Sequence, residues 1–136
     1  MSDPDCLFCK IVSGQIPSHK IDEDDKTLAF MDINPWTRGH ALVIPKEHSR
    51  NIYDANPDDL AATHVAAQRL AQRMRERLNC DGINVLQSSE PVAMQTVFHT
   101  HVHVIPRYSD DGLRMPAHPQ PAEQDELAAL AEELRG

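Results

Sequence analysis

The run from Val97 to Arg107 constrains this chain more than any other segment, because three histidines alternate in it with residues that favour β-strands. In an extended strand, side chains at every second position point to the same face, about 7 Å apart. Read as a strand, the run therefore places His99, His101 and His103 on one face. An imidazole can act as a base, a nucleophile or a metal ligand. Three imidazoles in this register predict a strand that carries chemistry, a metal or both.

The length and charge of the chain limit its class. Its 136 residues suit one compact domain, and we expect a single domain over residues 1–136. The formal net charge of −8 argues against a nucleic-acid partner, because surfaces that bind phosphate backbones are basic. One local cluster of donors can still hold a small phosphorylated ligand. No apolar run reaches the length of a signal-peptide core or a membrane span, so the sequence predicts a cytoplasmic protein with no membrane contact.

The spacing of apolar residues predicts short strands in the first and last thirds of the chain and one long helix between them. The long helix is expected to begin after Asn56, a capping residue followed by proline, and to run to about Leu78. A short helix is expected around residues 7–12. Further strands are expected at residues 20–22, 27–33, 40–44 and 82–87. Because only one long helix separates the strands, the pattern predicts an antiparallel α+β fold.

A last amphipathic helix is expected at about residues 122–135, after a proline-rich stretch. Its apolar stripe needs a partner surface. Either the sheet of the same chain or a second copy could supply that surface.

Cys6 and Cys9 form a Cys-x-x-Cys pair in a chain whose three cysteines we expect to be reduced. Two thiolates at this spacing suit tetrahedral zinc, but two ligands do not close a site. The other two could come from the histidines at positions 19, 40, 48, 64, 99, 101, 103 and 118. His48 and His99 are the preferred pair, and a Cys2His2 shell would leave no open position, so the zinc would be structural. A thioredoxin-like redox pair is the alternative, weakened because no βαβ pattern follows.

If His99 binds the metal, His101 and His103 remain for chemistry. A neutral imidazole whose tautomer is fixed by its neighbours is a competent nucleophile toward phosphorus, and phosphoryl transfer mainly needs positioning and charge stabilisation. A catalytic metal held by all three histidines is the alternative, but residues at i, i+2 and i+4 on a flat strand diverge along about 13 Å. An adjacent pair of histidines could still share a metal.

The run from His99 to Ile105 resembles the His-φ-His-φ-His-φ-φ signature of the histidine triad (HIT) family of nucleotide hydrolases and transferases. Three further blocks, at residues 30–35, 39–48 and 95–98, are similar to the family's other motifs in order and spacing. Together they cover most of a core at residues 6–107 and leave the C-terminal tail uncovered. The resemblance implies a HIT fold with an antiparallel sheet, one long helix and a short N-terminal helix, and a homodimer that extends the sheet.

The resemblance also implies roles for individual residues. His101 would attack the α-phosphate of a nucleotide conjugate and form a nucleotidyl-histidine. His103 would contact the phosphate and help protonate the leaving group, while His40 would join the hydrogen-bond relay that orients His101. The catalytic set is completed by the first histidine of the row, which gives His40, His99, His101 and His103. The zinc ligands of many bacterial members correspond to Cys6, Cys9, His48 and His99.

The nucleotide site follows from the same resemblance. Asp32 matches the acid that holds the ribose hydroxyls, and Gln95 and Thr96 match residues of the phosphate loop. The base pocket and the remainder of the nucleotide site correspond to Leu7, Phe8, Ile11, Phe30, Ile33, Ser88 and Val97. The bound ligand would be a purine nucleotide or a conjugate of one.

The loop before the histidine run departs from the family pattern. Residues 88–94 contain no glycine where much of the family has an Asn-rich, Gly-containing loop. Ser88 replaces an asparagine that helps to hold the nucleotide, and Met94 stands where members often have glycine. Backbone amides approach a phosphate most closely where side chains are absent. We expect the departure to act on affinity or substrate choice.

The sequence thus predicts hydrolysis or transfer at the α-phosphorus of a purine nucleotide conjugate, such as a nucleoside phosphoramidate. A dinucleoside polyphosphate hydrolase is the nearest enzymatic alternative. The alternative from another class is a nucleotide-binding or zinc-stabilised interaction protein whose altered loop no longer supports turnover.

Overall fold

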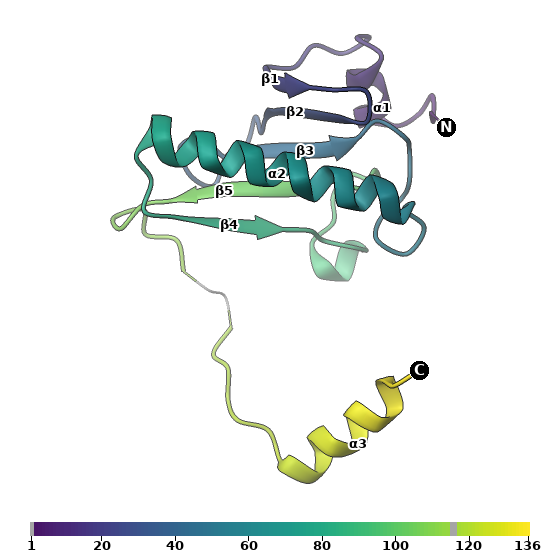
Figure 1. Cartoon of the computed structure of the whole chain (residues 1–136), viewed down its shortest axis with the longest axis vertical. Helices are drawn as coiled ribbons and strands as arrows, with labels where there is room; N and C mark the ends of the chain where they lie inside the picture. Colours follow the sequence, from purple (N-terminus) through teal and green to yellow (C-terminus); the bar gives the residue numbers. More distant parts are fainter. Residues whose placement is uncertain (1, 115–116) are drawn as a thin grey trace.

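Five antiparallel strands form the frame of the protein, and one long helix crosses one face of their sheet (Figure 1). The structure is a computed structural model that describes residues 2–114 and 117–136. The elements in chain order are α1 (Leu7–Val12), β1 (Lys20–Glu23), β2 (Thr27–Met31), β3 (Ala41–Pro45), α2 (Pro57–Leu78), β4 (Gly82–Leu86), a 3-10 turn (Pro91–Ala93), β5 (Val102–Arg107) and α3 (Gln124–Leu134). The predicted antiparallel α+β architecture is confirmed.

The strand order β1-β2-β3-β5-β4 brings distant parts of the sequence together. Central strands β3 and β5 pair with Leu42 opposite His103, so the predicted strand at 40–44 lies beside the histidine run. β4 forms the last strand of the sheet, on the side opposite to β1.

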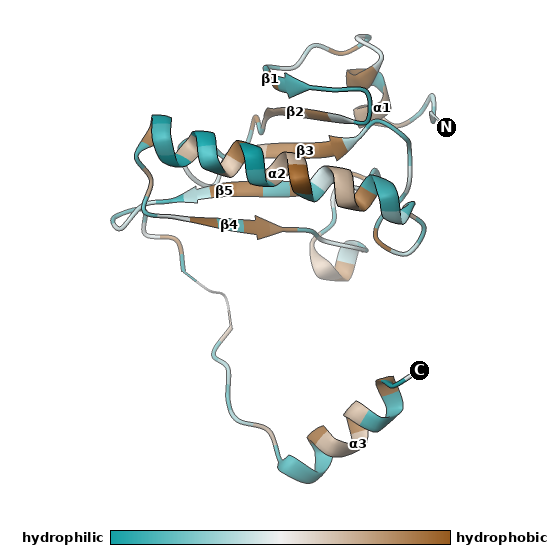
Figure 2. Cartoon of the chain, viewed as in Figure 1, coloured by the Kyte–Doolittle hydropathy of each residue, from teal (hydrophilic) through white to brown (hydrophobic). Residues whose placement is uncertain are grey.

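The central strands of the sheet are rich in apolar residues, as the brown colour of β2 and β3 in Figure 2 shows, and these residues pack on both faces of the sheet. Val43, Val102 and Val104 face α2 and pack with its buried residues, such as Leu70 and Met74. The opposite face carries a second apolar cluster around α1, made of Cys6, Phe8, Cys9, Ile11, Leu28, Phe30, Leu42 and Ile44. Central strands with two covered faces read as continuous apolar runs, which explains the sequence of β3.

The predicted long helix is confirmed with its cap. The Asn56 side chain accepts a hydrogen bond from the Asp58 amide, and Asn79 ends the helix in the left-handed conformation at φ 55°. The spacing of apolar residues along this helix also predicts His64 on its buried stripe together with Leu70 and Met74; this prediction is wrong, because His64 is exposed and its Nδ1 lies 3.0 Å from the Leu60 carbonyl oxygen. No helix of the described residues is long and apolar enough to span a membrane.

The prediction of one strand through all three histidines is wrong for its first half. β5 begins at Val102, so only His103 of the row belongs to it. The paired strand β3 ends at Pro45, which has no amide hydrogen to continue the ladder. The Thr100 amide instead donates to the Ser49 carbonyl oxygen, 2.9 Å away, beyond the end of β3. This early end turns the backbone of His99 out of the sheet.

The predicted C-terminal helix forms as α3, and none of its residues is buried. In Figure 1 it lies at the end of an extended segment, beyond the β4 side of the sheet and away from the rest of the chain. The sheet of its own chain does not cover its apolar stripe.

Candidate active site and metal centre

A cavity of about 250 Å³ opens on the sheet face opposite α2. Its wall is mainly apolar and comes from α1, from the chain after it, from β2 and from the segment before β5. The lining residues are Leu7, Phe8, Ile11, Ile16, Pro17, Ser18, Phe30, Met31, Asp32, Ile33, Asn34, Leu42, Thr96, Val97, His101 and His103. An apolar hollow with a few converging polar groups is the usual form of a small-molecule site.

Eight of the ten residues predicted for nucleotide binding line this cavity, and Ser88 and Gln95 do not. Gln95 is 3% exposed, and its side chain is used within the chain: Nε2 donates to the Arg50 and Val97 carbonyl oxygens. Its Oε1 accepts from the Glu90 amide and from Asn51. Gln95 therefore shapes the loop rather than the cavity wall.

Six lining residues were not predicted: Ile16, Pro17, Ser18, Met31, Asn34 and Leu42. Leu42 could have been found, because it shares the alternation of Leu28 and Phe30 across the paired strands. The hydroxyl of Ser18 is buried without a hydrogen-bond partner among the described residues, and no sequence signal marks it.

The backbone fixes the tautomer of His101. Its Nδ1 lies 2.7 Å from the carbonyl oxygen of His99, and a carbonyl can only accept, so Nδ1 carries the hydrogen. In the neutral ring Nε2 then keeps its lone pair. Phe8 meets the ring edge to face at 5.2 Å and holds it in a buried position, with 4% of the residue exposed. His101 is thus prepared as a nucleophile or base at Nε2.

A second backbone contact fixes the tautomers of His40 and His103. The Trp36 amide donates to His40 Nδ1 at 3.0 Å, so the hydrogen of the neutral His40 ring is on Nε2. That Nε2 lies 2.9 Å from His103 Nδ1, which must accept, and the hydrogen of neutral His103 is therefore on its own Nε2. The indole of Trp36 also stacks on His103, at 6.0 Å and 15° between planes. The relay leaves His103 with an N–H to donate.

Asp32 adds one negative charge beside this relay. Its Oδ2 lies 3.5 Å from His40 Nε2 and 4.0 Å from His103 Nδ1. Its other oxygen accepts from the Asn34 amide, which keeps the carboxylate at the cavity rim.

Burial keeps these imidazoles neutral. It lowers the pKa of His103 to about 4, with further lowering by the neighbouring His101 and His40. Burial also lowers the pKa of His101 and of His40, although the Asp32 carboxylate acts in the opposite direction on both. Neutral rings match the tautomers that the hydrogen bonds require.

The four predicted metal ligands come together on the other side of Phe8. Cys9 Sγ lies 3.4 Å from His48 Nδ1 and 3.5 Å from His99 Nδ1, and Cys6 Sγ lies 3.4 Å from the same His99 nitrogen. The two imidazole nitrogens are 3.2 Å apart. His99 turns its lone pair to this cluster because its Nε2 donates to the Pro45 carbonyl oxygen at 2.7 Å.

These separations fit a zinc ion. Tetrahedral bonds of zinc to sulfur and nitrogen imply about 3.6 Å between a sulfur and a nitrogen ligand and about 3.4 Å between two nitrogens. Burial raises the pKa of the Cys6 thiol and lowers that of His99 to about 4, so His99 offers a free lone pair and the thiols need a cation to ionise. The cluster therefore has the donor set and the spacing of a closed structural site.

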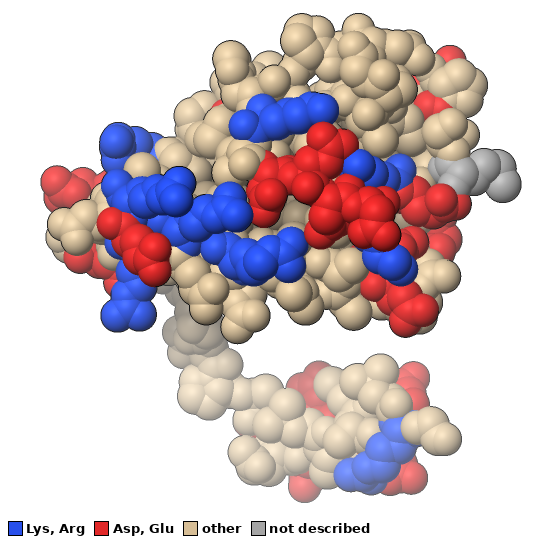
Figure 3. Space-filling model, turned by 45° about the horizontal axis from the view of Figure 1, so that its top comes forward, with Lys and Arg blue, Asp and Glu red and all other residues tan. Residues whose placement is uncertain are grey.

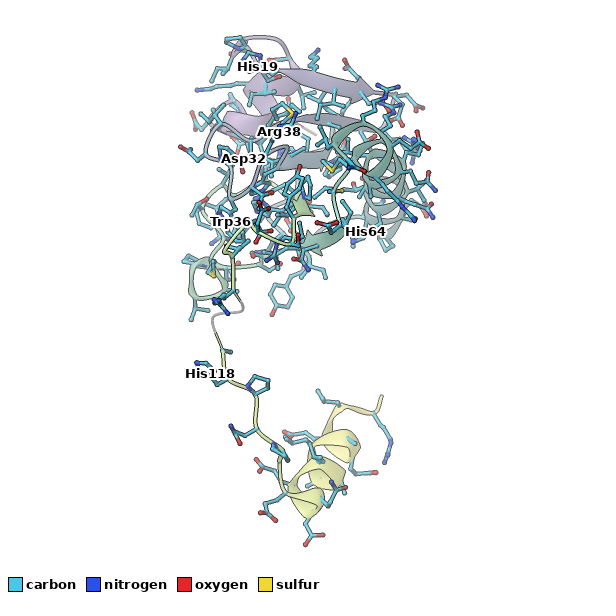
Figure 4. The ribbon with its side chains drawn as sticks, turned by 90° about the vertical axis from the view of Figure 1, so that its left-hand side faces the viewer. His19, Asp32, Trp36, Arg38, His64 and His118 are labelled. Carbon is cyan, nitrogen blue, oxygen red and sulfur yellow. The ribbon has the colours of Figure 1, made fainter. Side chains whose placement is uncertain are left out.

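Three histidines named as possible ligands lie elsewhere. Figure 4 shows His64 on α2, across the sheet from Asp32 and Trp36, and His118 on the extended segment that leads to α3. His19 is exposed and lies directly before β1.

The loop at residues 88–94 holds its shape without glycine. Glu90 and Met94 have positive φ values of 78° and 77°, a region that glycine occupies without strain. The Glu90 carboxylate accepts two hydrogen bonds from Arg50, at 2.8 and 2.9 Å, and one from Asn51. These contacts lower the pKa of Glu90 to about 2. Side-chain bonds thus hold a conformation that glycine would adopt freely.

Comparison with known proteins places the chain in a family. The model of the HIT domain matches residues 13–110, and the chain belongs to the HIT family. SMU.412c of Streptococcus mutans is 41% identical, and the superposition covers 98% of this chain and 85% of that one at a TM-score of 0.93. A histidine triad nucleotide-binding protein from Candida albicans is 35% identical over 96% of this chain and 94% of that one, with a TM-score of 0.87.

A third solved structure bears on the metal cluster. It is described as a Zn-bound histidine triad family protein from Mycobacterium smegmatis, and it is 43% identical with a TM-score of 0.79. The match covers 95% of each chain. The HIT fold expected from the sequence is confirmed by these structures.

Proposed function

We propose that the protein is a hydrolase or transferase of nucleotide conjugates that acts at the α-phosphorus through His101. The observation that carries the proposal is the tautomer of His101, whose Nδ1–H is held by the His99 carbonyl while Nε2 stays free at the cavity. A nucleotide base would fit the apolar wall beneath α1, and the ribose hydroxyls would bond to Asp32. A purine phosphoramidate is the preferred substrate class.

In the proposed reaction, His101 Nε2 forms a bond to the α-phosphorus as the bond from phosphorus to the leaving nitrogen or oxygen breaks. The leaving group keeps the electron pair and takes up a proton from solvent, helped by a hydrogen bond that His103 Nε2–H donates to it, and His40 fixes this tautomer through its bond to His103 Nδ1. Water then attacks the phosphorus, gives its proton to solvent and releases His101, so that both His101 and His103 end as the neutral rings they were at the start. The carbonyl of His99 stabilises the positive charge on the imidazole during both steps.

We further propose a structural zinc ion bound by Cys6, Cys9, His48 and His99. The spacing of the four ligand atoms supports it, and so does the zinc-bound relative from Mycobacterium smegmatis. A bound zinc would fix the segment that carries His99, whose carbonyl orients His101. Two thiolate ligands need a reducing compartment, which agrees with a cytoplasmic location. The active form is proposed as a homodimer.

A non-catalytic nucleotide-binding protein is the second candidate. It is favoured by the loop at residues 88–94, where Met94 places a side chain at a position that glycine often occupies in the family.

Trapping of a labelled nucleotide separates the two candidates. Protein is mixed with a purine phosphoramidate labelled in its nucleotide part and quenched under conditions that preserve phosphohistidine. We expect label on the wild type and none on His101→Ala, with intact binding of the free nucleoside monophosphate by both. Binding without label on the wild type would support the non-catalytic candidate, and equal labelling of both would refute the role of His101.

A further inference from the structure

The face of the sheet that α2 crosses is only partly covered. α2 packs mainly on β3 and β5, and a hollow of about 230 Å³ remains between its C-terminal half and strands β1 and β2, of which β1 is the edge of the sheet. Ile21 and Met31 form the floor of this hollow, and Leu70, Met74 and Leu78 form its α2 side. We call this hollow the edge groove.

Arginines border the edge groove. Arg73 and Arg77 line it directly, and Arg73 also contacts Asp22 of β1 at 3.1 Å. Arg77 forms no ion pair with any of residues 2–114 or 117–136. Figure 3 shows Lys and Arg side chains gathered at the end of this face where α2 ends.

The C-terminal helix has the complementary character. Leu127 and Leu130 are 45% and 44% exposed and lie with Leu134 on one stripe of α3. Its charged side chains are acidic: Asp125, Glu126, Glu132 and Glu133. An apolar stripe with acidic flanks fits an apolar groove with a basic border.

The position of α3 indicates whether it packs on its own chain or on a second copy of the chain. In Figure 1 α3 lies beyond the β4 side of its own sheet, whereas the edge groove lies on the β1 side. The superposition with SMU.412c covers 98% of this chain, so the few uncovered residues cannot include all eleven of α3. Residues of α3 therefore belong to the part of the chain that this superposition matches, at a TM-score of 0.93.

We propose that α3 docks in the edge groove of a second copy of this chain, and that the exchange is reciprocal. Strand β4 has no strand on its outer side among the described residues and exposes Val85 and Leu86. Joining two copies at β4 continues the sheet and carries each α3 over the other copy. The docked helix covers the part of the sheet that α2 leaves open. This inference rests on the proposed homodimer and is independent of the chemistry at His101.

The first test removes the apolar contact. We expect Leu130→Glu to raise the dimer dissociation constant, measured by sedimentation over a dilution series, by about a hundredfold. The matched control Ala129→Glu adds the same charge on the opposite side of α3 and leaves the constant within about twofold. Circular dichroism checks that both variants are folded.

The second test distinguishes docking on the other copy from docking on the same chain. Arg77→Glu makes the groove border acidic, and Glu126→Lys/Glu133→Lys makes α3 basic; each variant alone is expected to dimerise about tenfold more weakly. Mixing the two variants restores dimerisation if α3 docks on the other copy, because each helix then meets a groove of opposite charge. Arg75→Glu, on α2 but outside the groove, is the control for Arg77→Glu.

The outcomes separate the claims. A wild type that stays monomeric refutes both the homodimer and the docking of α3. A dimer that Leu130→Glu leaves unchanged refutes the docking alone. The exchange between copies is refuted if the mixed variants do not regain wild-type dimerisation but a single chain that carries all three substitutions does.

Discussion

The histidine row has two ends that use the same side chain differently. At one end, His99 donates from Nε2 to a backbone carbonyl and turns the lone pair of Nδ1 toward two cysteines and His48. At the other end, His103 accepts at Nδ1 from His40 and keeps a hydrogen on Nε2 at the cavity. Both rings are neutral and have the same tautomer. Because their hydrogen-bond partners differ, Nδ1 of His99 faces the proposed metal ligands and Nε2 of His103 faces the cavity.

His101 stands between these ends with the opposite tautomer. It donates from Nδ1 to the carbonyl of His99, so one residue is a proposed metal ligand through its side chain and an orienting group through its backbone. Loss of the ligands around His99, which we call the metal end, should therefore change the orientation of the His101 ring. Substitution of His103, at the catalytic end, should leave the metal ligands in place.

The largest effect is expected from loss of the metal end. Cys9→Ala removes the sulfur that contacts both His48 and His99, and we expect zinc to be lost with a destabilisation of about 5 kcal/mol, because binding of a structural zinc contributes directly to folding. Elemental analysis and urea unfolding measure the two quantities. Cys80→Ala, a cysteine outside the cluster, is the control, and zinc retained at one equivalent in Cys9→Ala would contradict the assignment.

The next effect isolates the catalytic end. His103→Ala removes the proposed hydrogen-bond donor that helps to protonate the leaving group, and we expect kcat to fall roughly 10³-fold, within the range for loss of one donor to a developing negative charge. Zinc content and the unfolding midpoint should stay near those of the wild type. Single-turnover kinetics measure the rate, and a loss of zinc in this variant would show that the two ends are not separable.

The pH dependence follows from the lowered histidine pKa values. Protonation of His101 removes its nucleophilic lone pair, so activity falls as pH drops through the pKa of the folded protein. Burial lowers the pKa of His101, so we expect kcat/KM to stay constant from pH 7.5 down to about pH 6.5, the usual pKa of a histidine side chain. Only at pH values below the lowered pKa should kcat/KM fall tenfold per pH unit. A half-maximal value at about pH 6.5 would contradict the neutral buried ring.

The smallest effect concerns the loop beside both ends. Met94→Gly should raise the free energy of unfolding by about 1 kcal/mol, because glycine adopts the φ of 77° without strain. Val92→Gly, at an exposed neighbouring position, is the control for added flexibility. Destabilisation by Met94→Gly equal to that of the control would show that the side chain is not strained.

The sequence predicted the parts of this site that depend on alternation and order. The spacing of the histidines and the Cys-x-x-Cys pair indicated the two sets of residues, and the cap at Asn56 indicated where α2 begins. It could not show that β5 begins only at Val102, because that depends on Pro45 ending the partner strand. Gln95 was assigned to nucleotide binding from its motif, but its side-chain amide already forms hydrogen bonds to Arg50, Asn51, Glu90 and Val97. Contacts of this kind join distant segments and leave no local pattern.

The most direct test of the account measures the ring tautomers. Long-range proton–nitrogen correlation spectra of zinc-loaded protein with ¹⁵N-labelled histidine distinguish a hydrogen on Nδ1 from one on Nε2, and variants of single histidines assign the signals. We predict Nδ1–H for His101 and Nε2–H for His40, His99 and His103 at pH 7.5. A spectrum with Nε2–H on His101 would contradict the account, because the nitrogen that faces the cavity would then have no lone pair for phosphorus.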